Sequence, residues 1–503
     1  MVNFDKHTSL ISLFDEVANG APDTWAVIGD GESVTYRQLQ ERSVAIARQL
    51  AGHGDQQGAL IGLRVGRNIE TVASILGILR AGAAYLPLDP TYPAERLRFM
   101  LEDSGARIVL DSSGAGDAVL AESPAEAVWR PDEHRETPVA YVAYTSGSTG
   151  RPKGCIITHG NVLAFLGGTI PLFDLGDKDR WTVFHSLSFD ASVWELWGAL
   201  GTGATAYLVP SNVIVNPAKF GALIKAAEIT VVSLVTSYFK FVVDVYKKST
   251  DRPRGLRHLF FVGEAIRLDL IQDFISLPEF SGVVPANMYG PTETTVFASY
   301  KVITAKDTME GPRSPIGVAL LNAGLKILDA SGRPLPAGEP GEIVISGSTV
   351  GHGYLNRAEL TSQRFPLIDG ARSYRTGDLG RQLPNGEFEY LGRMDQQIKR
   401  RGFRIEVEEI EQVLREHASV DDVVVCICTV GAAEYLVACI VRSGTSLEPN
   451  TDVLRERVKK LLPAVMCPDR YVFMPSLPYN DSGKLDRRGV QRLAQDELEG
   501  NSR

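Results

Sequence analysis

Apolar residues in the N-terminal part of the chain follow two spacings. In residues 35–52 and 70–82 they lie three or four positions apart, as on one face of a helix. Residues 59–65 and 84–89 are short apolar runs of the kind that form buried strands. Helical and strand patterns that alternate in this way are typical of βαβ units. The pattern predicts a layered α/β body.

From Ala337 onward the pattern changes to short β-like runs separated by turns. Residues 341–347 and 374–393 are such runs, and the Pro-Asn-Gly sequence at 384–386 predicts a hairpin turn. A small α+β unit is expected after this region. It begins with a basic segment at 398–406, and its helical patterns lie at 407–417 and 451–461. Its two strand patterns lie at 421–430 and 434–441.

The domain boundary is expected near Asp395, where the β-rich region gives way to the basic segment. The predicted fold is a multi-lobed α/β N-terminal domain, residues 1–394, followed by a small α+β C-terminal domain, residues 395–503. A chain of 503 residues exceeds the size at which one hydrophobic core stops growing, which also favours several lobes.

Composition and charge exclude several classes of protein. Apolar residues make up 44% and charged residues 22% of the chain, near the averages of globular proteins. The net charge of −9 disfavours general binding to nucleic acid or to anionic membranes. The N-terminus lacks a basic region followed by an apolar core, and Arg80 interrupts the apolar stretch at 72–88. A cytoplasmic protein is expected.

The five cysteines are too few, and odd in number, for a disulfide framework. Cys426 and Cys428 lie two apart in a strand pattern, so they are expected on one face of that strand. No second ligand pair has zinc spacing, and a buried apolar role is favoured over metal binding.

A glycine- and hydroxyl-rich loop carries the first candidate chemistry. Residues 114–138, rich in Gly, Ala, Glu and Pro, indicate a surface connection, and the apolar run 139–145 predicts a strand. The sequence YTSGSTGRPKG follows at 144–154, and its backbone N–H groups, hydroxyls and lysine suit phosphate oxygens. Pro152 before the lysine excludes a Walker A loop. The candidate phosphate ligands are Thr145, Ser146, Gly147, Ser148, Thr149, Gly150 and Lys153.

The chain resembles the ANL superfamily of adenylate-forming enzymes over nearly its whole length, most closely the adenylation domains of nonribosomal peptide synthetases. The resemblance rests on ordered motifs: VTYRQL from Val34, LRAGAAYLPLDP from Leu79, the phosphate loop, FDASVWE from Phe189, NMYGPTETT from Asn287, GEIVISG from Gly341, YRTGDLG from Tyr374, GRMDQQIKRRGFRIEVEEIE from Gly392 and NDSGKLDR from Asn480. One departure is Ser482, where the family often has Asn before the glycine.

The resemblance implies a set of ATP-binding and catalytic residues. Carboxylate attack on the α-phosphate needs positioned groups that neutralise phosphate charge. Lys484 matches the family's catalytic lysine. Thr292 is expected to contact a phosphate, and Glu293 matches the glutamate that binds magnesium. Asp378 is expected on the ribose hydroxyls, and Asp395 takes the hinge position. The remaining nucleotide contacts are Asn287, Tyr289, Gly290 and Arg393.

The FDASVWE motif points to an amino acid substrate within this superfamily. Asp190 matches the acid that pairs with a substrate ammonium, and a carboxylate in an apolar pocket needs such a cation. The pocket positions carried over from the family are Asp190, Ala191, Trp194, Ser233, Phe260, Val262, Met288, Val296 and Phe297. Large side chains at several of them favour a small aliphatic substrate. Alanine is the first expectation, and 2-aminobutyrate, serine, valine and a β-amino acid stay open.

The resemblance also implies partners and leaves two rival functions. An aminoacyl-AMP of this family is passed to the phosphopantetheine thiol of a carrier protein, and a small helper protein is a further partner. The sequence leaves open whether the enzyme is free-standing or one domain of a synthetase. An acyl-CoA or aryl-CoA ligase of the same fold is one rival; a catalytically inactive nucleotide-binding scaffold is the other. ATP–pyrophosphate exchange separates them.

Overall fold

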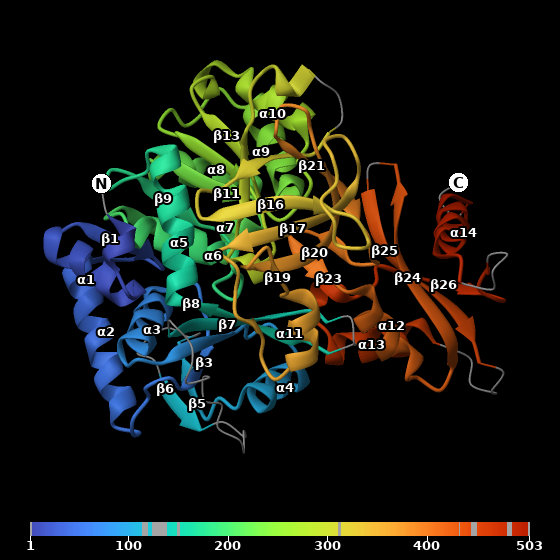
Figure 1. Ribbon diagram of the computed structural model, residues 1–503, viewed down its shortest axis with the longest axis horizontal. Helices are drawn as coiled ribbons and strands as arrows, with labels where there is room; N and C mark the ends of the chain where they lie inside the picture. The colour runs from blue at the N-terminus through green and yellow to red at the C-terminus, as the bar shows by residue number, and fades with distance from the viewer. Residues whose placement is uncertain are drawn as a thin grey trace. The chain divides into compact units, whose positions relative to one another are not determined.

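The computed structural model describes residues 3–112, 119–122, 138–147, 151–309, 313–431, 433–443, 450–479 and 485–500. These residues form two compact units (Figure 1). The first comprises Met1–Pro90, Leu101–Tyr144 and Gly154–Asp395. The second comprises Gln396–Arg503, together with the segments Thr91–Met100 and Thr145–Lys153.

The longer sheet of the first unit is mixed. Its strand order is β16 (Ala323–Leu328), β17 (Gly341–Gly347), β20 (Ala371–Gln382), β21 (Phe388–Arg393), β15 (Pro315–Ala319), β14 (Ser299–Val302), β13 (Val284–Tyr289), β12 (His258–Phe261), β11 (Val231–Leu234), β9 (Arg180–Val183), β10 (Thr205–Leu208), β1 (Trp25–Gly29) and β2 (Glu32–Thr35), with β19 (Leu367–Ile368) paired to β20. The stretch from β13 to β1 is parallel.

A second sheet has the order β18 (Gly353–Tyr354), β8 (Lys153–Thr158), β7 (Val139–Thr145), β4 (Ala84–Leu88), β3 (Leu60–Arg64), β5 (Ile108–Asp111) and β6 (Val119–Glu122). Strand β6 corrects one expectation, because residues 114–138 do not form only a surface connection. Its backbone pairs antiparallel with β5 and completes the edge of the sheet. The rest of that segment lies outside the described residues.

The helices of the first unit confirm the predicted βαβ pattern. The buried positions of α2 (Tyr36–Ala51) recur at helical spacing, and a capping box between Thr35 and Gln38 starts the helix. It packs beside α1 (Leu10–Gly20) and α3 (Ile69–Arg80) (Figure 1). Further helices are α5 (His159–Thr169), α6 (Ala191–Leu200), α7 (Ser211–Ile214), α8 (Pro217–Ala226), α9 (Thr236–Lys248), α10 (Leu268–Ile275) and α11 (Ala358–Arg364). Helix α4 (Ala94–Ser104) begins in the segment assigned to the second unit and ends in the first.

The predicted hairpin joins β20 to β21. The Leu383 N–H donates to the Glu387 carbonyl at 2.7 Å, and Gly386 adopts a φ of 87°, a conformation that favours glycine.

The second unit contains the hairpin β22 (Ile398–Arg400) and β23 (Phe403–Ile405), and a sheet of β24 (Val420–Val430), β25 (Ala433–Arg442) and β26 (Arg470–Met474). Its helices include α12 (Val407–Arg415), α13 (Thr451–Leu461) and α14 (Arg487–Gly500). No disulfide joins the five cysteines, all of which lie in the described ranges. Cys426 and Cys428 share one face of β24 as predicted, with their sulfur atoms 3.9 Å apart. Within the described ranges, no helix is long and apolar enough to cross a bilayer.

Candidate active site

The carboxyl ends of parallel strands from both sheets meet through a hydrogen-bonded contact. Asp89 follows β4 of one sheet, and Ser186 and Ser188 follow β9 of the other. The hydroxyls of Ser186 and Ser188 donate to Asp89 Oδ2 at 3.0 and 3.1 Å. In open α/β sheets, ligands bind outside the carboxyl ends of the strands. The candidate site residues that follow β9, β12 and β13 are placed at such an edge.

Asp190 lies at the start of α6, directly after this junction. The Thr292 hydroxyl donates to Asp190 Oδ2 at 2.5 Å. Burial raises the pKa of the Asp190 carboxyl, while this hydrogen bond and the Ala191 N–H oppose the shift. No cation of the described part of the chain forms a salt bridge with Asp190. The arrangement suits a ligand that brings its own positive charge.

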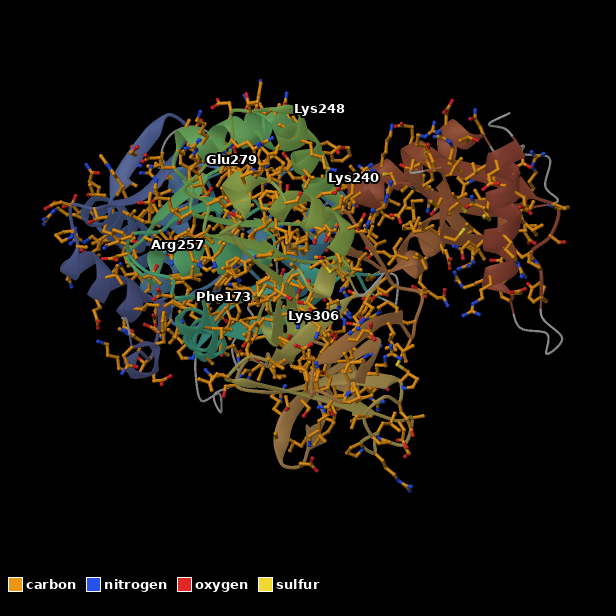
Figure 2. The ribbon with its side chains drawn as sticks, turned by 90° about the horizontal axis from the view of Figure 1, so that it is seen from above. Phe173, Lys240, Lys248, Arg257, Glu279 and Lys306 are labelled. Atoms are coloured by element: carbon orange, nitrogen blue, oxygen red, sulfur yellow. The ribbon has the colours of Figure 1, made fainter. Side chains whose placement is uncertain are left out.

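Behind Asp190 the predicted pocket residues form one aromatic cluster. Trp194 packs edge to face on Phe260, with ring centroids 5.3 Å apart, and on Phe297 at 6.3 Å. Phe173, labelled in Figure 2, also packs edge to face with Phe260, with ring centroids 4.9 Å apart. Val262, Met288 and Val296 are also buried, whereas Ala191 is partly exposed. Interlocked rings leave these side chains little freedom to move apart.

The loop that carries Val296 and Phe297 is strained and closely packed. Thr295 and Val296 have φ angles of 57° and 71°, which β-branched residues rarely adopt. The Thr295 hydroxyl donates to the Thr349 carbonyl at 2.7 Å and helps to hold this turn. A Cβ added at Gly290 would lie 2.6 Å from the Phe297 Cα, so glycine is needed there for packing.

A buried polar triad joins three of the predicted nucleotide-binding residues. The Tyr289 hydroxyl donates to Asp378 Oδ2 at 2.6 Å, and Arg393 donates to Asp378 Oδ1 at 2.7 Å. Asp378 and Arg393 are direct partners across β20 and β21, which explains their contact. Burial and the neighbouring Asp378 carboxylate raise the pKa of Tyr289 well above its usual value. Two hydrogen bonds, one to each carboxylate oxygen, therefore fix the orientation of the Asp378 side chain.

Asn287 and Glu293 are both buried and hydrogen-bonded. The Asn287 side-chain NH2 donates to the Pro315 carbonyl at 2.7 Å, so the amide oxygen is the group that suits a donor such as an adenine amino group. Glu293 Oε1 accepts from the Tyr354 hydroxyl at 2.6 Å. Carboxylate oxygen is a ligand that Mg²⁺ prefers, together with phosphate oxygens. Among the described side chains, no group of three or more His, Cys, Asp or Glu is arranged for a metal ion.

The phosphate-loop residues that are described belong to the second compact unit. Ser146 is buried; its hydroxyl donates to the Arg404 carbonyl at 2.8 Å and accepts from the Glu406 N–H at 3.2 Å. The Thr145 hydroxyl is buried with no hydrogen-bond partner in the described part of the loop or around it. A Cβ on Gly147 would lie 2.0 Å from the Arg151 carbonyl oxygen. Lys153 is mostly buried, and Ser148, Thr149, Gly150 and Lys484 lie outside the described residues.

Sequence reasoning missed three residues that contact or surround the predicted ones. His185 and Glu195 form a hydrogen-bonded pair, His185 interacts electrostatically with Asp190, and the Tyr354 hydroxyl donates to Glu293. Glu195 is the last residue of FDASVWE, and a buried acid at that position was the available signal. Tyr354 had none, because it lies 61 residues from Glu293.

Comparison with known proteins identifies the family of the chain. The chain matches the AMP-binding enzyme family over residues 14–355 and the AMP-binding enzyme C-terminal domain over residues 409–484. It is 35% identical to syringomycin synthase SyrB1 of Pseudomonas syringae pv. syringae, covering 95% of this chain and 81% of that protein. It is also 35% identical to a dimodular nonribosomal peptide synthase of Bacillus subtilis (strain 168), covering 96% of this chain but only 22% of that protein. The chain thus spans a minor part of the length of such synthases.

Solved structures show the same fold. An NRPS protein containing adenylation and PCP domains superposes with a TM-score of 0.82 at 27% identity, covering 98% of this chain and 85% of that one. The Vibrio cholerae adenylation domain AlmE, in complex with glycyl-adenosine-5'-phosphate, superposes with a TM-score of 0.82 at 22% identity. The match covers 99% of this chain and 98% of that one, and it shows a shared fold. By its matched length and its fold, the chain belongs to the AMP-binding enzyme family and is an adenylate-forming ligase of the ANL superfamily, with the fold of a nonribosomal peptide synthetase adenylation domain.

Proposed function

We propose that this ligase activates a small aliphatic amino acid, with alanine as the first candidate, and passes it to a carrier-protein thiol. In the first step a carboxylate oxygen of the amino acid attacks the α-phosphorus of ATP, and pyrophosphate leaves. In the second step the thiol of a phosphopantetheine arm attacks the acyl carbon, and AMP leaves. The product is an aminoacyl thioester for nonribosomal peptide synthesis.

The observation that carries this proposal is the position of Asp190. Its carboxylate lies at the start of α6, the helix that carries Trp194 of the expected pocket, and its described partners are a hydroxyl and a backbone N–H. A substrate ammonium supplies the missing positive charge, whereas a simple fatty or aryl acid would leave it uncompensated. Amino acids are therefore favoured over the substrates of an acyl-CoA ligase.

The aromatic cluster supports a small side chain. Phe260 and Phe297 are buried and locked against Trp194, so an aromatic substrate would have to displace packed rings. One methylene changes affinity by only about 1–3 kcal/mol in such a pocket, so 2-aminobutyrate and valine should be activated more weakly than alanine rather than excluded.

Serine is the second candidate because of one buried hydroxyl. Ser233 lies beside Phe260 in register on adjacent parallel strands, on the same face of the sheet. Its Oγ is buried and makes no hydrogen bond with any described residue. A substrate hydroxyl that reached Ser233 would satisfy it.

Several buried residues would hold ATP in this scheme. Asp378, fixed by Tyr289 and Arg393, would accept the ribose hydroxyls, and Asn287 would face the adenine amino group. Glu293 would bind Mg²⁺ together with the phosphates, and the cation would neutralise charge on them. Lys484 would bridge the substrate carboxylate and the α-phosphate. A helper protein and a cytosolic location complete the proposal.

The test is ATP–pyrophosphate exchange with the purified chain across the twenty amino acids, several β-amino acids and a panel of simple acids. Exchange with alanine above all others supports the proposal, and a maximum with serine selects the second candidate. Exchange with simple acids alone would make the protein an acyl-CoA or aryl-CoA ligase. A folded protein with no exchange for any acid would be the inactive scaffold.

A further inference from the structure

A histidine–glutamate pair lies at the end of β9, the strand that Asp190 also follows, and has no role in the scheme so far. His185 Nδ1 lies 2.9 Å from Glu195 Oε1, and the Phe184 and His185 N–H groups donate to Glu195 Oε2 at 3.0 Å each. The Glu195 side chain is fully buried. A carboxylate held by two backbone donors is a rigid acceptor, so the imidazole is held in one orientation.

The other ring nitrogen of His185, Nε2, is buried and makes no hydrogen bond with the residues that the structure describes. Because a carboxylate can only accept, the proton of a neutral imidazole lies on Nδ1, and Nε2 presents a lone pair. His185 is also close enough to Asp190 to influence its charge. The lone pair is thus an unused proton acceptor on a residue that follows β9, at the same strand edge as the candidate site residues.

The two half-reactions differ in their need for such an acceptor. Attack of a carboxylate on ATP transfers no proton, because the nucleophile is already ionised. A thiol with an ordinary pKa of about 8.5 is mostly protonated at neutral pH and reacts as the thiolate. We propose that His185, oriented by Glu195, is the general base that deprotonates the acceptor thiol in the second half-reaction; this rests on the function proposed above.

The step balances without any further reagent. The thiol S–H bond breaks as its proton passes to His185 Nε2, and the sulfur lone pair attacks the acyl carbon of the aminoacyl-AMP. The carbon–oxygen bond to the phosphate then breaks, and AMP leaves with that electron pair. Glu195 stabilises the resulting imidazolium, which returns its proton to solvent.

Other charged groups surround this pair. Asp190 interacts with His185 electrostatically, and Glu195 contacts the imidazole directly. Arg67 interacts with Glu195 and Asp89, and burial lowers the pKa of its guanidinium. These groups are present in every variant below, so a change in pH dependence after substitution of His185 reports on the imidazole.

The experiment measures single-turnover transfer from preformed aminoacyl-AMP to a phosphopantetheine-loaded carrier protein, as a function of pH. Wild type should change little between about pH 7 and 8.5. His185→Gln should transfer at least about 100-fold more slowly at pH 7, and its rate should rise about tenfold per pH unit until the thiol ionises by itself. His53→Gln, an exposed histidine outside the site, is the matched control and should behave as wild type.

Two results would overturn the proposal. One is a His185→Gln rate reduced by the same factor at every pH, which marks a positioning role. The other is a wild-type rate that itself rises tenfold per pH unit, which shows that no base assists; this needs no variant to fold. Absence of aminoacyl-AMP formation in wild type would instead contradict the proposed function and is measured separately by pyrophosphate exchange.

Discussion

At the scale of single residues, Asp190 makes the sharpest prediction. Asp190→Asn should raise the KM for the amino acid about 10- to 100-fold and leave the KM for ATP nearly unchanged, because only the ammonium loses its counter-charge. Since burial raises the pKa of the Asp190 carboxyl, the wild-type KM for the amino acid should rise as the pH falls toward that raised pKa. The variant should lose this dependence. Pyrophosphate exchange with each substrate varied in turn measures both, and equal effects on the two KM values would contradict the assignment.

A second prediction for a single residue concerns Lys484 and rests on the NDSGKLDR motif that contains it. Lys484→Ala should lower the rate of adenylate formation at least about 100-fold, because its proposed contacts form in the transition state. Its thermal unfolding midpoint should match that of wild type. Near-normal pyrophosphate exchange in the folded variant would remove Lys484 from the mechanism.

At the scale of elements, α14 closes the open edge of the C-terminal sheet. β24 is an edge strand, and its Ile427 carbonyl accepts from the Gln491 side chain at 2.7 Å. The Thr429 N–H donates to Gln495 at 2.8 Å. Side-chain amides thus replace a missing neighbouring strand. Arg487 at the start of the helix makes two bonds of 2.7 Å to Glu411, which is buried in α12.

This anchor predicts a stability difference between two adjacent arginines. Arg487→Ala leaves the buried Glu411 without its cation and should destabilise the protein by about 2–3 kcal/mol. Arg488→Ala removes an exposed neighbour and should change stability by less than about 0.5 kcal/mol. Urea unfolding followed by far-ultraviolet circular dichroism compares them. Equal midpoints for the two variants would show that the ion pair does not hold α14.

At the scale of the whole molecule, the boundary between the compact units follows Asp395. We expect the C-terminal lobe to rotate about this residue between the half-reactions, since Lys484 must leave the acyl carbon before the thiol arrives. Asp395→Pro would fix φ near about −65°, as proline does, and should retain most pyrophosphate exchange while losing transfer to the carrier protein.

Asp395→Ala separates the backbone effect from the side chain. Asp395 Oδ1 accepts from Arg393 Nε at 2.8 Å, and both substitutions remove that bond. Only proline restricts the backbone, so the alanine variant should support both half-reactions. If Asp395→Pro also supported both at wild-type rates, rotation about this residue would be ruled out.

Local patterns in the sequence were enough to predict several secondary elements and the family. Helices α2 and α3, strands β3 and β4 and the hairpin turn before β21 appear where periodicity and turn residues predict them. This succeeds because hydrophobic spacing and turn chemistry act over a few residues. The ordered motifs, each a continuous run, were sufficient to indicate an adenylating enzyme.

Long-range packing, in contrast, determines which of these residues bind one another. Tyr289 meets Asp378 across 89 positions of sequence, and strand order and register bring them together. Strand β6 forms because β5 offers it an edge, which composition does not reveal. The pairing of His185 with Glu195 depends on how α6 turns back over the end of β9. Such contacts arise from packing between separate elements, and no local pattern encodes them.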